Sequence, residues 1–121
     1  MYDHIGLKVK NFPRSRRFYE SALKPLGLTI QSQDETSAGF GTKQATGLWI
    51  SAGAPAPTGL HIAFAAPTRE AVAKFHAAAL EAGGRDNGKP GLRESYGPTY
   101  YAAYAYDPDG NNVEAVCFAK K

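Results

Sequence analysis

The sequence is poor in cysteine and has no long hydrophobic run. Cys117 is the only cysteine, which excludes a disulfide within the chain and favours a reducing compartment. No apolar stretch approaches the ~20 residues that a membrane-spanning helix needs. The first residues also lack the basic segment followed by an apolar one that is typical of a secretion signal. These absences predict a cytoplasmic protein that does not enter the membrane.

Charge of one sign is not concentrated anywhere in the chain. The net charge of +3 comes from scattered basic residues, and no nucleic-acid-binding motif accompanies them, so nucleic acid is not an expected partner. Arg14, Arg17 and Arg93 are candidates for steering an anionic substrate toward a cleft. With 121 residues, 43% of them hydrophobic, the chain can form one compact domain without structural metal or disulfides.

The first half of the chain is repeated in the second at an offset of 57 residues. His4 opens one copy and His61 opens the other, and the register continues without a gap over three further pairs, Phe18 with Phe75, Leu23 with Leu80, and Gly27 with Gly84. A repeat of this length is a whole supersecondary unit, which predicts two copies of one motif about a pseudo-twofold axis. We expect the two histidines to meet near that axis.

Hydrophobic periodicity predicts the same order of elements in both copies. A strand at 3–9 precedes a helix from Pro13 to Gly27 and strands at 28–33, 36–42 and 47–51; a strand at 60–65 precedes a helix from Thr68 to Gly83, a glycine-rich loop at 86–93 that could hold a short strand, and strands at 99–106 and 111–118. We therefore predict a single α+β domain, 1–121, with module 1 at 1–53, a proline-containing linker at 54–58 and module 2 at 59–121. The expected fold is two pseudo-symmetric β-α-β-β-β modules that form a curved mixed sheet around a cleft, with the helices on the outer face.

Strand alternation places three polar side chains on the face away from the helices. His4, His61 and Glu114 each alternate with apolar neighbours that should pack beneath the helices. A lone histidine on a strand is commonly just a hydrogen-bonded side chain, but two repeat-related histidines with one carboxylate suit Fe, Mn, Ni or Zn. His76, on a predicted helix where the first copy has Tyr19, is interpreted as a surface or interface residue without a metal role.

Together these segments resemble the vicinal oxygen chelate superfamily, which includes glyoxalase I, bleomycin-resistance proteins, fosfomycin-resistance thiol transferases and extradiol dioxygenases. The resemblance rests on four segments, Asp3-His4-Ile5-Gly6-Leu7-Lys8-Val9, Arg17-Phe18-Tyr19-Glu20, Gly59-Leu60-His61-Ile62-Ala63-Phe64 and Asp107-Pro108-Asp109-Gly110-Asn111-Asn112-Val113-Glu114. It implies paired β-α-β-β-β modules around one divalent metal ion, with His4, His61 and Glu114 as ligands. Because single-chain members often dimerise, it also implies a homodimer.

Departures from the family pattern narrow the expected reaction. Trp49 stands where glyoxalase I has a fourth ligand, a glutamate that moves the substrate proton, so true glyoxalase I chemistry is not expected. The histidine that dioxygenases usually have near the start of the penultimate strand is missing here. Gly6 replaces the hydroxyl residue that the thiol transferases usually have two positions after the first histidine.

Tyrosines are the main candidates for contact with a substrate. Alternation puts Tyr100, Tyr104 and Tyr106 on one strand face and Tyr101 on the other, although a register shift of one residue would exchange the faces. Tyrosine is common in strands for packing reasons alone, but one facing the metal could donate a hydrogen bond to a bound oxyanion. Tyr104 is the first candidate for this catalytic role and Tyr96 the second.

Three functions remain open on the sequence. The leading one is a metal-dependent enzyme, dioxygenase- or lyase-like, that chelates a small oxygenated molecule through two oxygens. In it Trp49, Tyr100 and Arg93 are expected to bind substrate. The second is a metal-free protein that sequesters a drug or metabolite, as bleomycin-resistance proteins do. The third is a structural module whose metal holds the fold.

Overall fold

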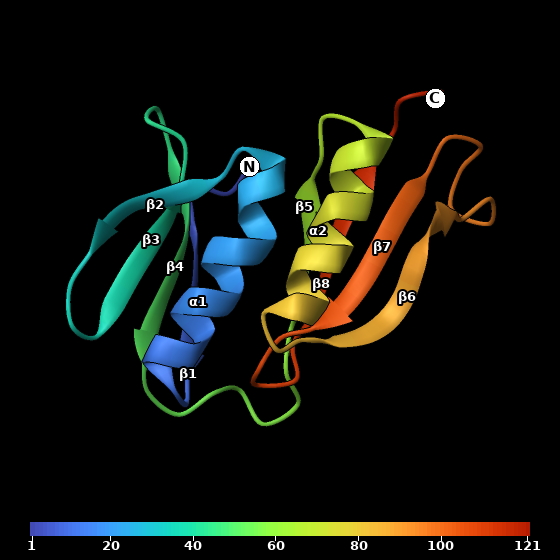
Figure 1. The fold of residues 1–121 in the computed structure, drawn as a ribbon. Helices are drawn as coiled ribbons and strands as arrows, with labels where there is room; N and C mark the ends of the chain where they lie inside the picture. Colours follow the sequence, from blue (N-terminus) through green and yellow to red (C-terminus); the bar gives the residue numbers. More distant parts are fainter.

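The computed structural model describes residues 1–121, which form two modules with the same order of elements (Figure 1). The first module contains β1 (Ile5–Val9), α1 (Phe12–Leu23), the short 3-10 helix η1 (Lys24–Leu26), β2 (Thr29–Gln33), β3 (Ser37–Gly41) and β4 (Thr46–Ala52). The second contains β5 (His61–Ala65), α2 (Arg69–Glu81), β6 (Arg85–Leu92), β7 (Tyr101–Tyr106) and β8 (Asn112–Cys117). The predicted α+β fold of two β-α-β-β-β modules is confirmed.

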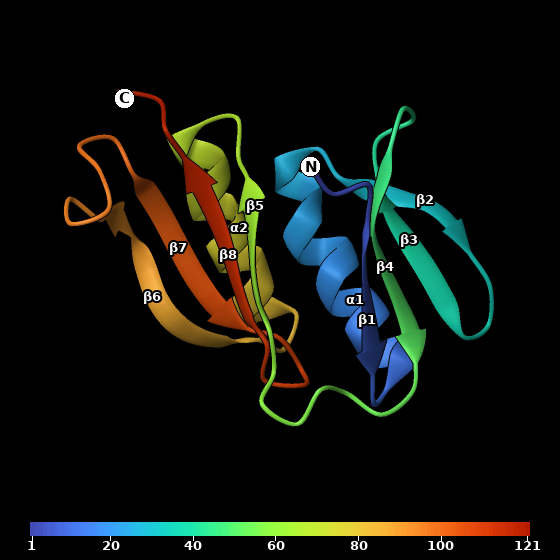
Figure 2. The ribbon, with the colours of Figure 1, turned by 180° about the vertical axis from the view of Figure 1, so that it is seen from behind.

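Each module has its own four-stranded mixed sheet. The strand orders, β1-β4-β3-β2 in sheet A and β5-β8-β7-β6 in sheet B, are the same, and in each the first strand pairs in parallel with the last. Seen from behind, β1 and β5 are the inner strands of the two sheets (Figure 2). No hydrogen-bonded pairing joins the two strands, so the sheets remain separate.

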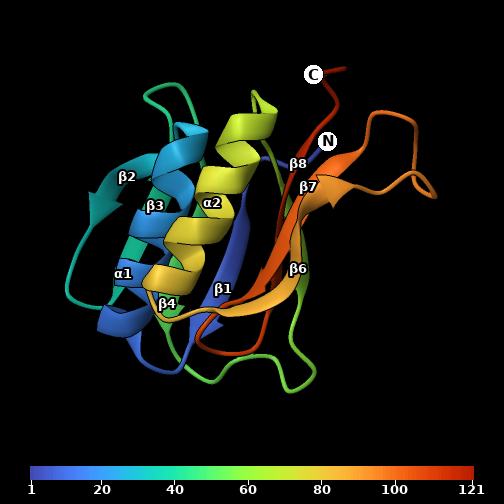
Figure 3. The same ribbon diagram turned by 45° about the vertical axis from the view of Figure 1, so that its right-hand side comes forward.

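The helices cover one face of the sheets and leave the other open. α1 packs on sheet A, α2 packs on sheet B, and the two helices pack against each other (Figure 3). Asn11 caps α1 and Thr68 caps α2, each by accepting a backbone N–H of the first turn. The buried hydrophobic side chains of both modules form one continuous core, which includes Phe18 and Phe75. Neither helix is both long and apolar enough to cross a membrane.

The turn between β7 and β8 fastens the second module to the first. Asp107 Oδ1 accepts the backbone N–H groups of Asp109 at 2.9 Å and Asn111 at 2.8 Å, while Gly110 takes a positive φ of 85°. The other carboxylate oxygen of Asp107 accepts a hydrogen bond from the buried Tyr19 hydroxyl on α1. In addition, the backbone N–H of Lys10 points to Asp109. This turn, which belongs to one of the segments that carry the family resemblance, therefore fixes the two modules relative to each other.

Two segments differ from the prediction. Residues 85–92 form the full edge strand β6, whereas a glycine-rich loop with room for a short strand was expected. Its pairing with β7 is interrupted by two register shifts, one on each side of Gly88. A strand paired in this irregular way does not need alternating apolar and polar residues, and the segment has none. The first helix ends at Leu23 and continues as η1, because Pro25 has no N–H to donate to the α-helical ladder.

Candidate functional site

The open face of sheet B brings together two of the three predicted ligands. His61 is the first residue of β5 and Glu114 lies on the neighbouring β8, and His61 Nε2 is 2.7 Å from Glu114 Oε1. The Glu114 side chain is only 1% exposed, whereas that of His61 is 56% exposed. A buried carboxylate needs hydrogen bonds or a cation to offset its lost hydration. Glu114 is therefore held in place beneath an imidazole that solutes can reach.

Two tyrosines of the same face complete the surroundings of Glu114. The Tyr100 hydroxyl donates to Glu114 Oε2, and Tyr104 pairs directly with Glu114 across β7 and β8. Burial raises the pKa of the Tyr100 phenol, and the hydrogen bond to Glu114 raises it further. Burial and the negative charge of Glu114 also raise the pKa of Tyr104. Both phenols therefore keep their protons at neutral pH, and the predicted faces of this strand are confirmed.

An open hollow of about 740 Å³ lies over these side chains. Its lining includes His61, Tyr100, Tyr104 and Glu114 together with Tyr96, whose 68% exposed ring packs edge-on against Tyr100. The hollow is large enough for a small organic molecule.

Arg93 is not among the residues that line this hollow, but it stacks on Tyr104, which does line it. Its guanidinium carbon is 5.3 Å from the centroid of the Tyr104 ring, a cation–π distance. The ring of His61 also lies near Tyr104, with 6.4 Å between centroids. Tyr104 thus contacts both a candidate ligand and a cation.

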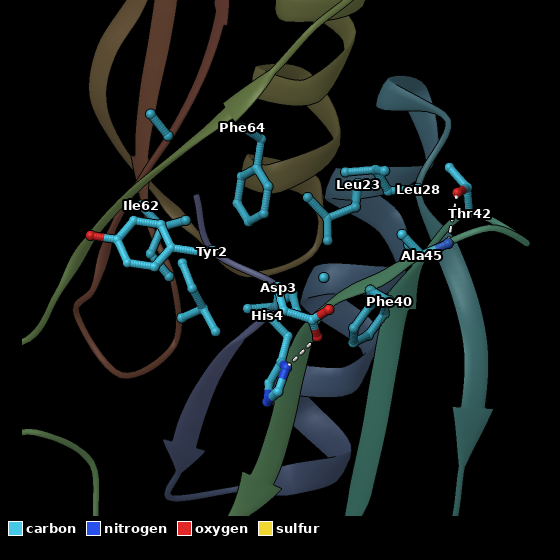
Figure 4. A pocket seen from close by; sticks show the side chains of 15 residues that line it. Tyr2, Asp3, His4, Leu23, Leu28, Phe40, Thr42, Ala45, Ile62 and Phe64 are labelled. Carbon is cyan, nitrogen blue, oxygen red and sulfur yellow. Dashed lines mark hydrogen bonds and ion pairs between the residues drawn. The ribbon is translucent and has the colours of Figure 1, made fainter.

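His4 and Trp49 do not join this group within one chain. His4 Nδ1 is bonded to Asp3 at 2.7 Å, and its side chain lines a different pocket (Figure 4). Trp49 lies on the open face of sheet A, where its ring covers Gly39, since a Cβ there would come within 2.8 Å of the ring. The expected meeting of His4 with His61 within the chain is therefore wrong, because β1 and β5 belong to separate sheets whose arrangement is set by the packed helices.

The donor set fits a divalent metal in part. Two ligands about 2.1 Å from one ion and at right angles lie about 3 Å apart, close to the separation of His61 Nε2 and Glu114 Oε1. No three side chains of His, Cys, Asp or Glu come close enough within the chain to hold a metal ion. One chain therefore supplies an imidazole and a carboxylate, and a three-ligand site needs a further donor from outside it.

His76 has a structural position that the sequence did not predict. It is 7% exposed rather than superficial, and its Nε2 lies 2.8 Å from Asp86 Oδ1 at the start of β6. The available signal in the sequence was the position of His76 on the apolar side of the predicted helix, which indicates burial. The pair fastens α2 to the edge of sheet B and lies outside both pockets described here.

The second pocket, of about 360 Å³, lies between the modules (Figure 4). Most of its lining is hydrophobic, including Leu23, Phe40 and Phe64, and its ionisable residues are Tyr2, Asp3 and His4. Nothing in the strand pattern pointed to it, because its walls come from the N-terminal residues, α1, sheet A and β5 together.

Comparisons with known proteins agree with this architecture. The family model described as Glyoxalase/Bleomycin resistance protein/Dioxygenase superfamily matches residues 2–115. A glyoxalase/bleomycin resistance protein from Albidiferax ferrireducens has 29% identity and a TM-score of 0.82, over 97% of this chain and 98% of that one. A putative glyoxalase from Bacillus halodurans has 26% identity and a TM-score of 0.72, over 97% and 95%. No curated protein matches the chain.

Proposed function

The chain belongs to the Glyoxalase/Bleomycin resistance protein/Dioxygenase superfamily, and we propose that it is a metal-dependent enzyme acting on a small oxygenated molecule at the open face of sheet B. One observation carries the proposal. His61 Nε2 and Glu114 Oε1 lie 2.7 Å apart below an open hollow, and Glu114 is held in place by burial and hydrogen bonding. An enzyme site needs this combination of fixed donors and free access.

The third ligand in this proposal is His4 of the partner subunit in a homodimer. His4 is exposed just before β1 of its own chain, and its Nδ1 is hydrogen-bonded to Asp3, which leaves Nε2 free to bind a metal ion. His61 and Glu114 lie on the open face of sheet B, whereas His4 lies just before β1 and lines the pocket between the modules. A twofold-related pair of chains that places sheet A against sheet B would assemble two equivalent sites.

A bound divalent ion would act as a Lewis acid toward two neighbouring substrate oxygens. Tyr100 holds Glu114 through a hydrogen bond, which fixes the orientation of the carboxylate. Tyr104 faces the same hollow with a protonated phenol and can donate a hydrogen bond to a substrate oxyanion. In this assignment Tyr104 is the catalytic residue that touches substrate, and Tyr100 is a positioning residue. The exposed Tyr96 closes one side of the hollow.

Metal reconstitution followed by elemental analysis tests the ligand assignment. We expect about one Fe, Mn, Ni or Zn ion per chain in the wild type and strongly reduced occupancy in His4→Ala, His61→Ala and Glu114→Ala. His76→Ala is a matched control, because His76 is paired with Asp86 away from the hollow. Full occupancy in all three ligand variants would refute the site.

A mixing experiment tests whether the site is shared between subunits. In a dimer made from one His4→Ala chain and one Glu114→Ala chain, one site has lost both residues and the other keeps all three ligands. Random exchange of subunits should therefore restore about a quarter of the wild-type metal content to two variants that bind none separately. No recovery after verified subunit exchange would refute a shared site.

A second candidate function is metal-free capture of an apolar small molecule. The pocket between the modules favours it, because the pocket is lined mainly by hydrophobic side chains such as Phe40 and Phe64. Binding of an aromatic ligand to metal-free protein, lost in Phe64→Ala and unaffected by Glu114→Ala, would support this function over the first.

A further inference from the structure

Arg93 is the cation nearest to the ring of Tyr104, and its position is defined by several contacts. Its Nη2 donates to the carbonyl oxygen of Lys89 at 2.6 Å, and its guanidinium stacks on Tyr104 at 5.3 Å. The side chain is half-buried. An arginine side chain loses much rotamer freedom when it is fixed in this way. The fixed guanidinium is therefore a built feature of this face.

Two glycines on β6 make room for the guanidinium. A Cβ at Gly88 would lie 3.3 Å from Nη2, and a Cβ at Gly91 would lie 3.1 Å from Nη1. Gly88 also has a φ of 154°, which side-chain-bearing residues rarely adopt. The strand thus lacks side chains where Arg93 folds back over the sheet. The irregularly paired part of β6 around Gly88 and Gly91 therefore provides the space that Arg93 occupies.

The charge of Arg93 has no carboxylate partner within the chain. The side-chain salt bridges involve other groups, such as Arg16 with Glu20 and Lys74 with Glu70. Glu114 is occupied by His61 and Tyr100. A guanidinium has five N–H donors in one plane, but in Arg93 only the Nη2 group donates to an acceptor of the chain. The remaining donors are available to bind an anion.

We propose that the substrate carries a carboxylate in addition to its metal-binding oxygen pair, and that Arg93 binds this carboxylate across the ring of Tyr104. The inference rests on the proposed function and names the substrate class of that site. Such a molecule would extend from the metal ligands past Tyr104 to the guanidinium, because the Tyr104 ring lies near both His61 and Arg93. The net charge of +3 also favours the approach of an anion.

Paired ligands that differ only in the carboxylate test this proposal. Catechol, 2,3-dihydroxybenzoate and 3,4-dihydroxybenzoate share the oxygen pair, and their affinities for zinc-loaded protein can be measured by isothermal titration calorimetry. Zinc avoids oxidation of the ligands, because it has no redox chemistry. We expect at least one dihydroxybenzoate to bind the wild type about ten- to a hundredfold more tightly than catechol, as a hydrogen bond to a charged group would give.

Arginine variants identify the residue responsible. Arg93→Gln should reduce the preference to within about twofold, and Arg93→Lys should keep part of it, since lysine retains the charge without the planar fork. Arg69→Gln is the matched control: Arg69 also stacks on a tyrosine, Tyr101 at 5.0 Å, but that ring lies on the helix-covered face. It should keep the full preference.

Three outcomes would count against the proposal in distinguishable ways. A wild-type protein that binds catechol but neither benzoate more tightly would overturn the inference and leave the proposed function standing. A preference that persists in folded Arg93→Gln protein would also overturn it. Failure of all three ligands to bind zinc-loaded protein would refute the proposed function and this inference with it.

Discussion

Trp49 and Glu114 occupy equivalent positions in the two modules. Trp49 on β4 pairs with Gly6 on β1, and Glu114 on β8 pairs with Ala63 on β5, while Gly6 and Ala63 are themselves related by the 57-residue repeat. The strand pairing therefore places Trp49 in module 1 where module 2 has Glu114. One module offers a carboxylate at this position, and the other offers an indole ring.

This asymmetry predicts poor activity on the hemithioacetal of glutathione and methylglyoxal. With Trp49 in place of a carboxylate, module 1 has no base at this position to move the substrate proton. Metal-loaded wild-type protein should produce lactoylglutathione at the rate of a protein-free control, as followed by ultraviolet absorption. Robust, metal-dependent formation of this product would contradict the prediction. Trp49→Glu introduces the carboxylate and is the variant in which activity should rise.

Tyr104→Phe should weaken the binding of an anionic catechol. The phenol of Tyr104 faces the hollow, whereas that of Tyr100 is already bonded to Glu114. Loss of one hydrogen bond to a charged group should cost about 1.5–3 kcal/mol of binding free energy. Calorimetric titration of zinc-loaded protein measures this change. Tyr106→Phe is the control, because Tyr106 shares the strand face but lies outside the hollow, and an equal loss there would argue against a specific role for Tyr104.

Local sequence patterns predicted most of the fold. The repeat gave the two modules, and alternation placed Glu114 and Tyr104 on one face, which the pairing of β7 with β8 confirms. The sequence predicted at most a short strand where the full β6 lies, because Gly88, Pro90 and Gly91 remove the alternation of side chains and the pairing depends on β7 instead. Such bulged edges are defined by the partner strand rather than by their own residues.

The site was predicted only as far as each module defines it. His61 and Glu114 meet because parallel neighbours β5 and β8 fix their register. Whether His4 joins them depends on how the modules pack, and long-range contacts such as Tyr19 with Asp107 decide that. These contacts leave no periodic signal, and the separation of His4 from His61 could not be predicted from the repeat.

The shared site predicts a homodimer in solution. The open faces of both sheets carry exposed polar and aromatic residues. β2 and β6 are edge strands, each with a neighbouring strand on one side only. Multi-angle light scattering at micromolar concentration should give about twice the chain mass of 13.0 kDa. A mass of one chain at every concentration would contradict both the dimer and the contribution of His4 from a partner.

Tyr19→Phe should destabilise the protein without disrupting the Asp107 turn. The variant removes one donor to a buried carboxylate, and Asp107 keeps its bonds from Asp109 and Asn111. The free energy of unfolding, measured with urea, should fall by about 1.5–3 kcal/mol. Tyr2→Phe is the control, because the Tyr2 ring is exposed, and it should change the stability by less than about 0.5 kcal/mol.

The same hydroxyl predicts a pH dependence at the alkaline end. Burial, and then the charge of Asp107, raise the pKa of Tyr19 well above its ordinary value of 10.0. In the folded state the phenol therefore keeps its proton at a pH where the unfolded chain loses it. Because the folded state then binds more protons, this contribution is complete below pH 10 and is lost as the pH rises above it, at up to about 1.4 kcal/mol per pH unit.

Comparison of the wild type with Tyr19→Phe isolates this effect from the titration of lysines. The difference between their unfolding free energies should be constant from about pH 7 to pH 9 and should shrink above about pH 10, because phenylalanine has no proton to lose. Urea unfolding at a series of pH values measures the difference. A gap that stays constant or widens through pH 11 would show that Tyr19 is not held protonated in the folded state.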